Sequence, residues 1–264
     1  MTLKQENASD DSAAVIEKIT AQYRAIKLPY LADTKLYLGT PFPILEGISR
    51  ALAEQLYEDD KKKFKNRLRY AGIIKERSQN TFFWDDDTYP MAEPGVIERV
   101  LTIEFLRQHK NLVVLGPPGV GKSMLVTIVA CKAVREGFSL KYKTSHDIAL
   151  ELKESKTSNN LSVYIKKLYT CDVLVIEDAT FTTFNLKTSQ AFFSIMDKRY
   201  QGCKSTVITS NGSISEWAAK FPDISMSSAI LGRFYENSIL VNMNGAVDFR
   251  LKQAKGLIEN TGAV

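Results

Sequence analysis

A glycine-rich octapeptide in the middle of the chain constrains its fold more than any other feature. The octapeptide consists of Gly116, Pro117, Pro118, Gly119, Val120, Gly121, Lys122 and Ser123, with Met124 directly after it. The apolar run at 111–115 has the length of a strand, and 124–130 reads as a buried helix. A strand, a turn of this sequence and a helix, in this order, form the phosphate-binding loop known as Walker A. The pattern therefore predicts a site for a nucleoside triphosphate, with ATP as the expected nucleotide.

The spacing within this loop has a chemical reason. Glycine lets the backbone wrap around a polyphosphate, so that backbone N–H groups and the start of the next helix point at negative charge. The Lys122 ammonium is expected to reach the β- and γ-phosphates, and the Ser123 hydroxyl is expected to bind Mg²⁺. The alternative is a glycine-rich turn without a function, and the flanking strand and helix argue against it.

Apolar strands and helical stretches alternate after residue 94. Strands are predicted at 111–115, 138–143, 173–176, 205–209 and 238–242. Helices are predicted between them, and a single helix is predicted over 96–109. Such alternation is typical of an α/β fold with a parallel sheet and helices on both faces. Ligands of these folds bind at the carboxyl ends of the strands, where the Walker A loop also emerges.

The pattern before residue 94 is different. Residues 1–12 are polar and acidic, and we expect them to be disordered. Residues 13–79 read as a small N-terminal helical unit that includes a basic segment. Residues 80–93 are neither periodic nor helical and read as a linker, whose aromatic side chains either cover the adenine base or simply pack. Residues 94–264 are then the nucleotide-binding core, with a small helical part at the C-terminus.

Two carboxylates, Glu177 and Asp178, follow the predicted strand at 173–176. A P-loop ATPase carries its Walker B acids here: one holds the water shell of Mg²⁺, and another orients or deprotonates the attacking water. The usual order is Asp followed by Glu or Asp, whereas Glu177 comes first in this chain. A glutamate still reaches the metal through water, because Mg²⁺ retains several waters. The shorter Asp178 is less well placed as a base, so we expect slow turnover. Two surface carboxylates at a strand end are the alternative.

A polar residue, Asn211, follows the next predicted strand. An uncharged amide at this place can form a hydrogen bond with the γ-phosphate or with the attacking water. Turn formation is the alternative role for an asparagine after a strand. Its position after the strand that follows the acidic one favours the role at the nucleotide.

A dense basic block lies in the N-terminal unit, with aromatic residues between the cations. The cations are Lys61, Lys62, Lys63, Lys65, Arg67 and Arg69. Lysine and arginine on one side of a helix neutralise phosphates and release counterions from DNA. The alternative is a solvated helix face balanced by the acids at 58–60. Acids and bases are segregated along this stretch, which favours contact with nucleic acid.

The composition excludes several classes of protein. The net charge is +5, and 44% of the residues are hydrophobic, which is ordinary for a globular protein. No apolar run approaches the roughly 20 residues of a membrane helix, and the N-terminus lacks a signal-peptide core. We therefore expect a cytoplasmic protein without a membrane partner. With two histidines and three widely spaced cysteines, a metal site of those residues is not expected.

Several segments together resemble a known family, the IstB-type transposition helper ATPases. They are relatives of the DnaC and DnaI helicase loaders in the AAA+ superfamily. The matching segments are NLVVLGPPGVGKS at 111–123, CDVLVIEDA at 171–179, FFSIMDKRYQGCKSTVITSN at 192–211 and SAILGRFYENSILVNMNG at 228–245. The resemblance extends more weakly to 67–87 and to 248–255. It implies a P-loop AAA+ core after a small N-terminal helical unit.

The resemblance also implies roles for residues. Asn211 matches the family's sensor asparagine, and Arg233 matches an arginine finger that acts on the nucleotide of a neighbouring subunit. A surface ion pair is the alternative for Arg233. Arg250 and Lys252 are weaker candidates for contact with phosphate or DNA.

The family's function implies a DNA-binding ATPase that forms a homo-oligomer on double-stranded DNA in its ATP state and assists a cognate transposase. A helicase loader that prefers single-stranded DNA is one alternative. An ATP-binding switch with little turnover is another, because of the reversed order of Glu177 and Asp178.

Overall fold

The protein is described here from a computed structural model, which covers residues 3–82, 84, 88–154 and 160–251. Within these ranges the description excludes the side chains of residues 3–10, 81, 214, 224–226 and 229–230. By its internal contacts the chain divides into two units, residues 1–66 and residues 67–264.

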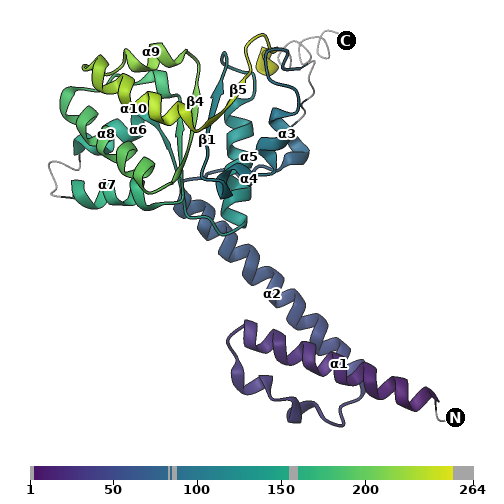
Figure 1. Ribbon diagram of the computed structural model, residues 1–264. Helices are drawn as coiled ribbons and strands as arrows, with labels where there is room; N and C mark the ends of the chain where they lie inside the picture. The colour runs from purple at the N-terminus through teal and green to yellow at the C-terminus, as the bar shows by residue number, and fades with distance from the viewer. Residues whose placement is uncertain (1–2, 83, 85–87, 155–159, 252–264) are drawn as a thin grey trace, which may run out of the picture. The chain divides into compact units, whose positions relative to one another are not determined.

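The elements are named in chain order (Figure 1). The α-helices are α1 (Leu3–Ala25), α2 (Phe42–Ala71), α3 (Val96–Leu101), α4 (Glu104–Arg107), α5 (Lys122–Arg135), α6 (Ser145–Glu154), α7 (Leu161–Thr170), α8 (Leu186–Gln201), α9 (Ile214–Ala218) and α10 (Ile224–Glu236). The 3₁₀ helices are η1 (Pro29–Ala32), η2 (Thr34–Tyr37), η3 (Gln79–Thr81) and η4 (Ala179–Phe181). The strands are β1 (Asn111–Leu115), β2 (Leu140–Thr144), β3 (Val173–Glu177), β4 (Ser205–Ser210) and β5 (Ser238–Asn242).

The first unit has a small apolar core of its own. Its buried members come from α1, η2 and α2, and are Ile16, Ile19, Tyr37, Leu45 and Leu52. The spacing of these residues along α1 and α2 is that of one helix face, because three to four residues make one turn. Packing of these faces supplies most of the stability that short isolated helices lack.

The helix α1 begins earlier than the sequence indicated. It starts at Leu3, so the expectation of disorder through residue 12 differs from the structure. Buried Ile16 and Ile19 fix the later part of α1 in the core. Once a helix is nucleated, each added residue contributes one backbone hydrogen bond, so the helix extends through a polar segment without needing an apolar face there.

The boundary between the units also differs from the predicted linker at 80–93. It falls after Asn66, inside α2, because the residues that follow are bound to the nucleotide-binding core. The Lys141 Nζ on β2 donates to the backbone oxygen of Tyr70, 2.9 Å away, and lies 3.5 Å from the centroid of its ring. Glu76 pairs with Arg135 of α5 at 3.0 Å. The end of α2 and the segment after it therefore belong to the second unit.

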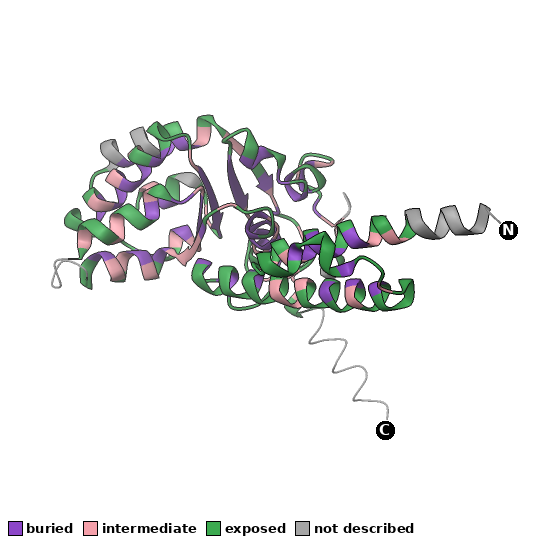
Figure 2. Ribbon diagram, turned by 90° about the horizontal axis from the view of Figure 1, so that it is seen from below, coloured by how far each residue is buried: buried purple, intermediate pink, exposed green. Residues whose placement is uncertain are grey.

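The second unit contains a parallel sheet in the order β2–β3–β4–β1–β5 (Figure 1). All of its strand pairs are parallel, as the strand–helix alternation predicts. The central strands are buried on both faces (Figure 2), which explains why they read as continuous apolar runs. In register, Leu115 at the end of β1 pairs with Ser210 at the end of β4. Polar residues that follow β3 and β4 therefore meet the loop that follows β1.

Helices cover both faces of this sheet. On one face, side chains of α6 to α10 form a core with Val113, Leu174 and Ile208 of the strands, in which Phe192 and Trp217 are fully buried. On the other face α5 packs against β2, β3 and β4, and α3 packs against α5 (Figure 1). Among the described residues, no helix is both long and apolar enough to cross a membrane.

The single helix predicted at 96–109 is two helices, α3 and α4. They are separated at Ile103, which is fully buried and has the left-handed φ of 58°. The Thr102 hydroxyl donates to the Arg99 backbone oxygen at 2.7 Å and accepts from the Glu104 N–H at 3.3 Å. These local bonds replace those of a continuous helix. Hydrophobic periodicity alone did not reveal this break.

Candidate nucleotide-binding site

The Walker A loop joins β1 to α5 at the carboxyl edge of the sheet. Its residues border a cavity of about 390 Å³. From the loop, Pro118, Gly119, Gly121, Lys122, Ser123 and Met124 line this cavity. Asp178, Asn211 and Arg250 line it from the other side. Arg77, from the segment after α2, lines the cavity as well, so residues from five separate segments surround one space large enough for part of a nucleotide.

Lys122 is held inside the loop by backbone oxygens. Its Nζ donates to the oxygens of Gly116 at 2.7 Å and Pro117 at 2.8 Å. Burial lowers the pKa of Lys122, while the charge of Asp178 opposes that effect. Two neutral carbonyls offset only part of the unfavourable free energy of burying the Lys122 ammonium. A negatively charged phosphate is a stronger acceptor and should replace them when a nucleotide binds.

Aromatic residues from the predicted linker pack against the loop. The Tyr89 hydroxyl donates to the backbone oxygen of Val120 at 2.8 Å, and Tyr89 and Phe82 are buried. A Cβ placed at Gly121, whose φ is +102°, would lie only 3.0 Å from the Tyr89 hydroxyl and 3.1 Å from the Phe82 ring. Glycine is needed here both for its backbone conformation and for this close approach. Phe82 and Tyr89 therefore support the loop by packing.

A C-terminal segment reaches the same loop from far along the chain. The Phe249 N–H donates to the Gly119 oxygen at 3.2 Å. The Asp248 carboxylate accepts from the Arg250 N–H at 2.8 Å, and a Cβ at Gly119 would overlap this carboxylate. These contacts bring the Arg250 side chain to the cavity, where its charge also lowers the pKa of Lys122. Sequence reasoning gave Arg250 little weight.

Asp178 has an unusual backbone conformation. Its φ of 53° lies in the left-handed region, which aspartate tolerates better than most residues. Its N–H donates to the Thr209 hydroxyl at 3.1 Å, and its backbone oxygen accepts from the Ser145 hydroxyl at 2.7 Å. These bonds hold Asp178 in a sharp turn after β3, so that its side chain lines the cavity opposite Lys122. A strained residue held this firmly beside a cavity points to a functional role.

Glu177 lies beside an adjacent cavity of about 300 Å³, which Ser123 also lines. Its Oε1 atom is buried and has no hydrogen-bond partner. Tyr142 lies nearby: burial raises the pKa of Tyr142, and the Glu177 carboxylate raises it further. Because this carboxylate oxygen has no partner and lies on the same cavity as Ser123, it can accept a hydrogen bond from a water of the Mg²⁺ shell.

The described residues contain no group of three His, Cys, Asp or Glu that could hold a metal ion by themselves. Mg²⁺ does not need such a group, because it usually binds one or two protein side chains and completes its shell with phosphate oxygens and water. Ser123 and Glu177 therefore fit Mg²⁺ only together with a bound nucleotide.

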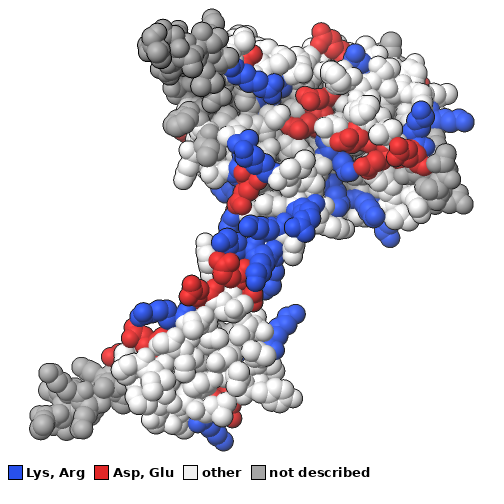
Figure 3. Space-filling view, turned by 180° about the vertical axis from the view of Figure 1, so that it is seen from behind, with Lys and Arg blue, Asp and Glu red and all other residues white. Residues whose placement is uncertain are grey.

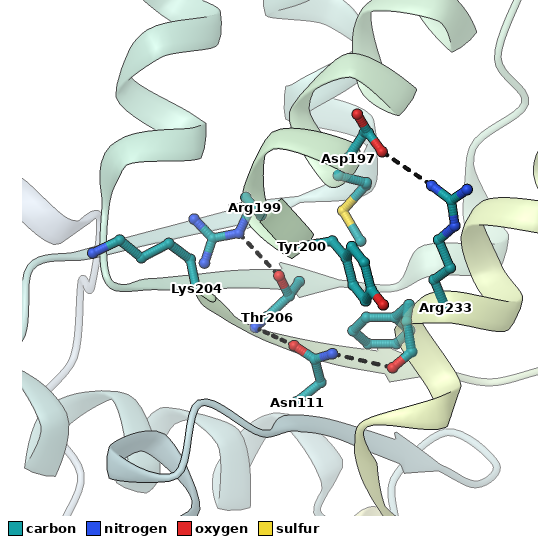
Figure 4. A pocket seen from close by; sticks show the side chains of 9 residues that line it. Asn111, Asp197, Arg199, Tyr200, Lys204, Thr206 and Arg233 are labelled. Atoms are coloured by element: carbon teal, nitrogen blue, oxygen red, sulfur yellow. Dashed lines mark hydrogen bonds and ion pairs between the residues drawn. The ribbon is translucent and has the colours of Figure 1, made fainter. Parts of the chain in front are cut away.

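Arg233 lies at the opposite edge of the sheet. It lines a small cavity together with Asn111 and Thr206, which stand at the beginnings of β1 and β4 (Figure 4). The Walker A loop follows the end of β1, so the two edges are separated by a five-residue strand, which spans on the order of 16 Å. The structure does not bring Arg233 to the nucleotide cavity of its own chain. Instead its Nη1 pairs with Asp197 at 3.1 Å.

The predicted DNA-binding cations all lie on α2. Each of them is exposed, and Figure 3 shows Lys and Arg side chains gathered along this helix; they are Lys61, Lys62, Lys63, Lys65, Arg67 and Arg69. Lys61 pairs with Glu58 at 3.2 Å on the surface. An exposed pair of this kind is weak and exchanges readily for a phosphate.

Three of these cations share one side of α2. At about 100° per residue, Lys62, Lys65 and Arg69 fall within an arc of about 60°. Phe64 and Leu68 are buried and form a separate stripe along the helix. Lys62, Lys65 and Arg69 are thus the set most able to contact one DNA backbone.

Comparison with known proteins places this geometry in a family. The sequence matches the family described as IstB-like ATP binding protein over residues 42–256. The chain belongs to this family. The match includes the Walker A loop, both acidic residues, Asn211, Arg233 and the basic part of α2. As a member of the IstB-like family, the chain binds nucleotide, and its resemblance to IstB-type proteins is confirmed.

The curated relatives of this IstB-like chain come from insertion sequences. It is 25% identical over 214 residues to the insertion sequence IS5376 protein of Geobacillus stearothermophilus, covering 80% of this chain and 82% of the relative. It is 26% identical over 210 residues to the insertion sequence IS21 protein of Pseudomonas aeruginosa, covering 80% and 78%. The names of both relatives describe ATP-binding proteins of insertion sequences.

Solved structures support the fold. AMPPCP-bound DnaA from Aquifex aeolicus is similar with a TM-score of 0.55 at 19% identity, over 70% of this chain and 55% of that chain. The crystal structure of DnaI is similar with a TM-score of 0.53 at 17% identity, over 64% and 91%. At these identities the likeness concerns the fold alone, and it confirms the predicted α/β core, a parallel sheet flanked by helices around the Walker A loop.

Lys252, the other weak candidate for contact with phosphate or DNA, lies outside the described residues.

Proposed function

We propose that this IstB-like chain is an ATPase that assembles on duplex DNA in its ATP-bound state and assists a transposase. The observation that carries the proposal is the convergence of Lys122, Ser123, Asp178 and Asn211 on one cavity. These residues come from the ends of three parallel strands, and each has a chemical type that phosphoryl transfer to water requires.

Each residue has a defined task in this reaction. Lys122 exchanges its two carbonyl acceptors for oxygens of the β- and γ-phosphates. Asp178 lies across the cavity and orients the attacking water, and Asn211 donates a hydrogen bond to that water or to the γ-phosphate. Bound Mg²⁺ would neutralise phosphate charge during the reaction, with Ser123 and, through water, Glu177 as the residues that hold it.

The location of Arg233 supports the proposal of an oligomer. A guanidinium that stabilises charge on the transferred phosphate must contact it, and Arg233 lies at the wrong edge of the sheet to do so in its own chain. We therefore assign Arg233 to the nucleotide of a second copy, which is the role that the family resemblance implies. This arrangement makes hydrolysis depend on assembly, and it makes assembly depend on bound ATP.

DNA contact is assigned to the exposed cations of α2. We expect these cations to contact DNA phosphates and not base edges, so that binding does not depend on the base sequence. The insertion-sequence relatives support transposition as the setting, since their names connect them to mobile elements. A transposase is accordingly the proposed partner.

Electron microscopy of the protein with a non-hydrolysable ATP analogue and duplex DNA tests the proposal. We expect a ring or filament on the duplex that disappears without nucleotide and in the Arg233→Ala variant. Arg107→Ala is the matched control, because the Arg107 side chain is 55% exposed, compared with 54% for Arg233, and also pairs with an acid. Assembly on single strands alone would favour a helicase loader, and an absence of ordered assembly would contradict the proposal.

A further inference from the structure

The Arg233 guanidinium contacts two neighbours on α8. Its Nη1 donates to Asp197 Oδ1 at 3.1 Å, and its guanidinium carbon lies 5.9 Å from the centre of the Tyr200 ring (Figure 4). Asp197 and Tyr200 lie three residues apart, so they face the same side of α8. Among the described residues, the Nε and Nη2 atoms of Arg233 form no hydrogen bond or ion pair. Most of the guanidinium donors therefore remain available to a ligand.

The part of α8 that carries these neighbours is firmly fixed. Arg199, between Asp197 and Tyr200 in sequence, is buried and donates to the Thr206 hydroxyl at 2.9 Å and the Leu168 oxygen at 2.8 Å. The bond to Thr206 connects α8 to β4 (Figure 4), and the bond to Leu168 connects α8 to α7. Asp197 and Tyr200 thus stand on a rigid base, while the Arg233 side chain itself is 54% exposed.

We infer that Asp197 and Tyr200 are positioning residues that hold Arg233 extended for the nucleotide of a second copy of this chain. The inference rests on the proposed function, in which Arg233 acts between copies. A long exposed arginine loses rotamer freedom when it binds. Contacts with Asp197 and with the Tyr200 ring already restrict the Arg233 side chain, so less conformational entropy is lost when Arg233 binds the second copy.

The contact with Asp197 positions the guanidinium without withholding it. One carboxylate oxygen accepts one of five N–H donors. The pair is partly solvated, with 38% of the Asp197 side chain exposed. Ion pairs of this kind are weak, and a triphosphate carries more charge than one carboxylate. The remaining donors can therefore engage phosphate while the pair with Asp197 persists or exchanges.

A mixing experiment tests this role separately from folding and nucleotide binding. The acceptor copy carries Arg233→Ala and keeps its own nucleotide site. The donor copy carries Asp178→Asn, which should keep bound ATP without releasing phosphate, and keeps its own Arg233. Phosphate release is measured on duplex DNA for each variant alone and for mixtures with the donor in excess. Only interfaces between unlike copies then contain both a competent nucleotide site and an arginine.

Asp197→Asn is next introduced either into the donor or into the acceptor. We expect release by the mixture to fall roughly two- to fivefold with the change in the donor and to stay unchanged with it in the acceptor. A purely structural role would lower release from either copy. The matched control is Glu93→Gln in the donor, which removes a comparable ion pair with Arg99 and should leave release unchanged.

The outcomes distinguish the action of Arg233 between copies from the positioning role of Asp197 and Tyr200. If the mixture releases no more phosphate than its components, the action of Arg233 between copies is refuted. If the mixture is active but Asp197→Asn in the donor leaves release equal or raises it, the positioning role is refuted. Tyr200→Phe in the donor keeps the aromatic ring and should leave phosphate release unchanged, whereas Tyr200→Leu should lower it. Equal phosphate release with both variants would refute the positioning role of Tyr200.

Discussion

Arg199 offers a quantitative test of how the nucleotide-binding core is held together. Its guanidinium is buried and directs its donors at oxygens from α7, β4 and the segment before β3. The closest acceptors are the backbone oxygens of Leu168, Cys171 and Ser205 and the hydroxyl of Thr206, and the Asp172 backbone oxygen accepts at 3.4 Å. Burial lowers the pKa of Arg199, so these oxygens must compensate a charge that is removed from water.

The magnitude follows from these acceptors. Arg199→Met removes the charge and leaves four buried oxygens short of a donor, at about 1 kcal/mol or more for each. Relief from burying the charge returns part of this loss, so we expect the free energy of unfolding to fall by about 2–4 kcal/mol. Arg199→Lys keeps the charge with fewer donors in a different geometry, so it should be at least as destabilising as Arg199→Met.

Urea unfolding followed by the fluorescence of buried Trp217 measures this effect. With a slope of about 2–3 kcal/mol per molar urea, the midpoint of Arg199→Met should shift down by about 1 M. The control is Arg107→Met, which removes an exposed arginine and should change the free energy by less than about 1 kcal/mol. An unchanged midpoint for Arg199→Met, or an Arg199→Lys variant as stable as the parent, would refute the reasoning.

Three further predictions concern the nucleotide and the DNA. Burial lowers the pKa of Lys122 from its ordinary value of 10.5, and ATP binding requires the protonated amine, so ATP affinity should fall with rising pH, starting at a lower pH than an ordinary lysine would give; an affinity that does not fall with rising alkaline pH contradicts this. Asp178→Asn should keep the ATP affinity measured by fluorescent titration and lose steady-state phosphate release, and parental release would assign the attacking water to another residue. Exchanging Lys62, Lys65 and Arg69 together for alanine should flatten the slope of log affinity for duplex DNA against log salt by roughly two to three units, and an unchanged slope would return α2 to the status of a solvated helix.

The elements around the Walker A loop were predictable because local signals coincide there. The loop sequence fixes a strand before it and a helix after it, and the carboxylates Glu177 and Asp178 follow a second apolar strand. Parallel strands bring their carboxyl ends to one edge, so the proximity of Asp178 and Lys122 follows from fold class alone. The family resemblance supplied Arg233, which no local pattern distinguishes from a surface arginine.

Features that depend on contacts between distant segments were not predictable. Arg250 reaches the cavity because Phe249 binds Gly119, which lies far earlier in the chain. Residues 67–79 belong to the core because Lys141 binds Tyr70, although the helix itself continues from the first unit. Periodicity reports which face of an element is apolar, but it does not report which element covers that face. Likewise, the order of the strands in the sheet could not be derived from their order in the chain.

The affinity of the protein for one duplex DNA, measured with and without ATP, tests whether assembly on DNA depends on ATP. We expect tighter binding with ATP, because the nucleotide bound to one copy gives Arg233 of the next copy a phosphate to contact on the DNA. Lys122→Ala, which lacks the principal charge for the phosphates, should bind the duplex equally in both conditions. If the parent protein binds the duplex with the same affinity whether or not ATP is present, ATP-dependent assembly on DNA is contradicted.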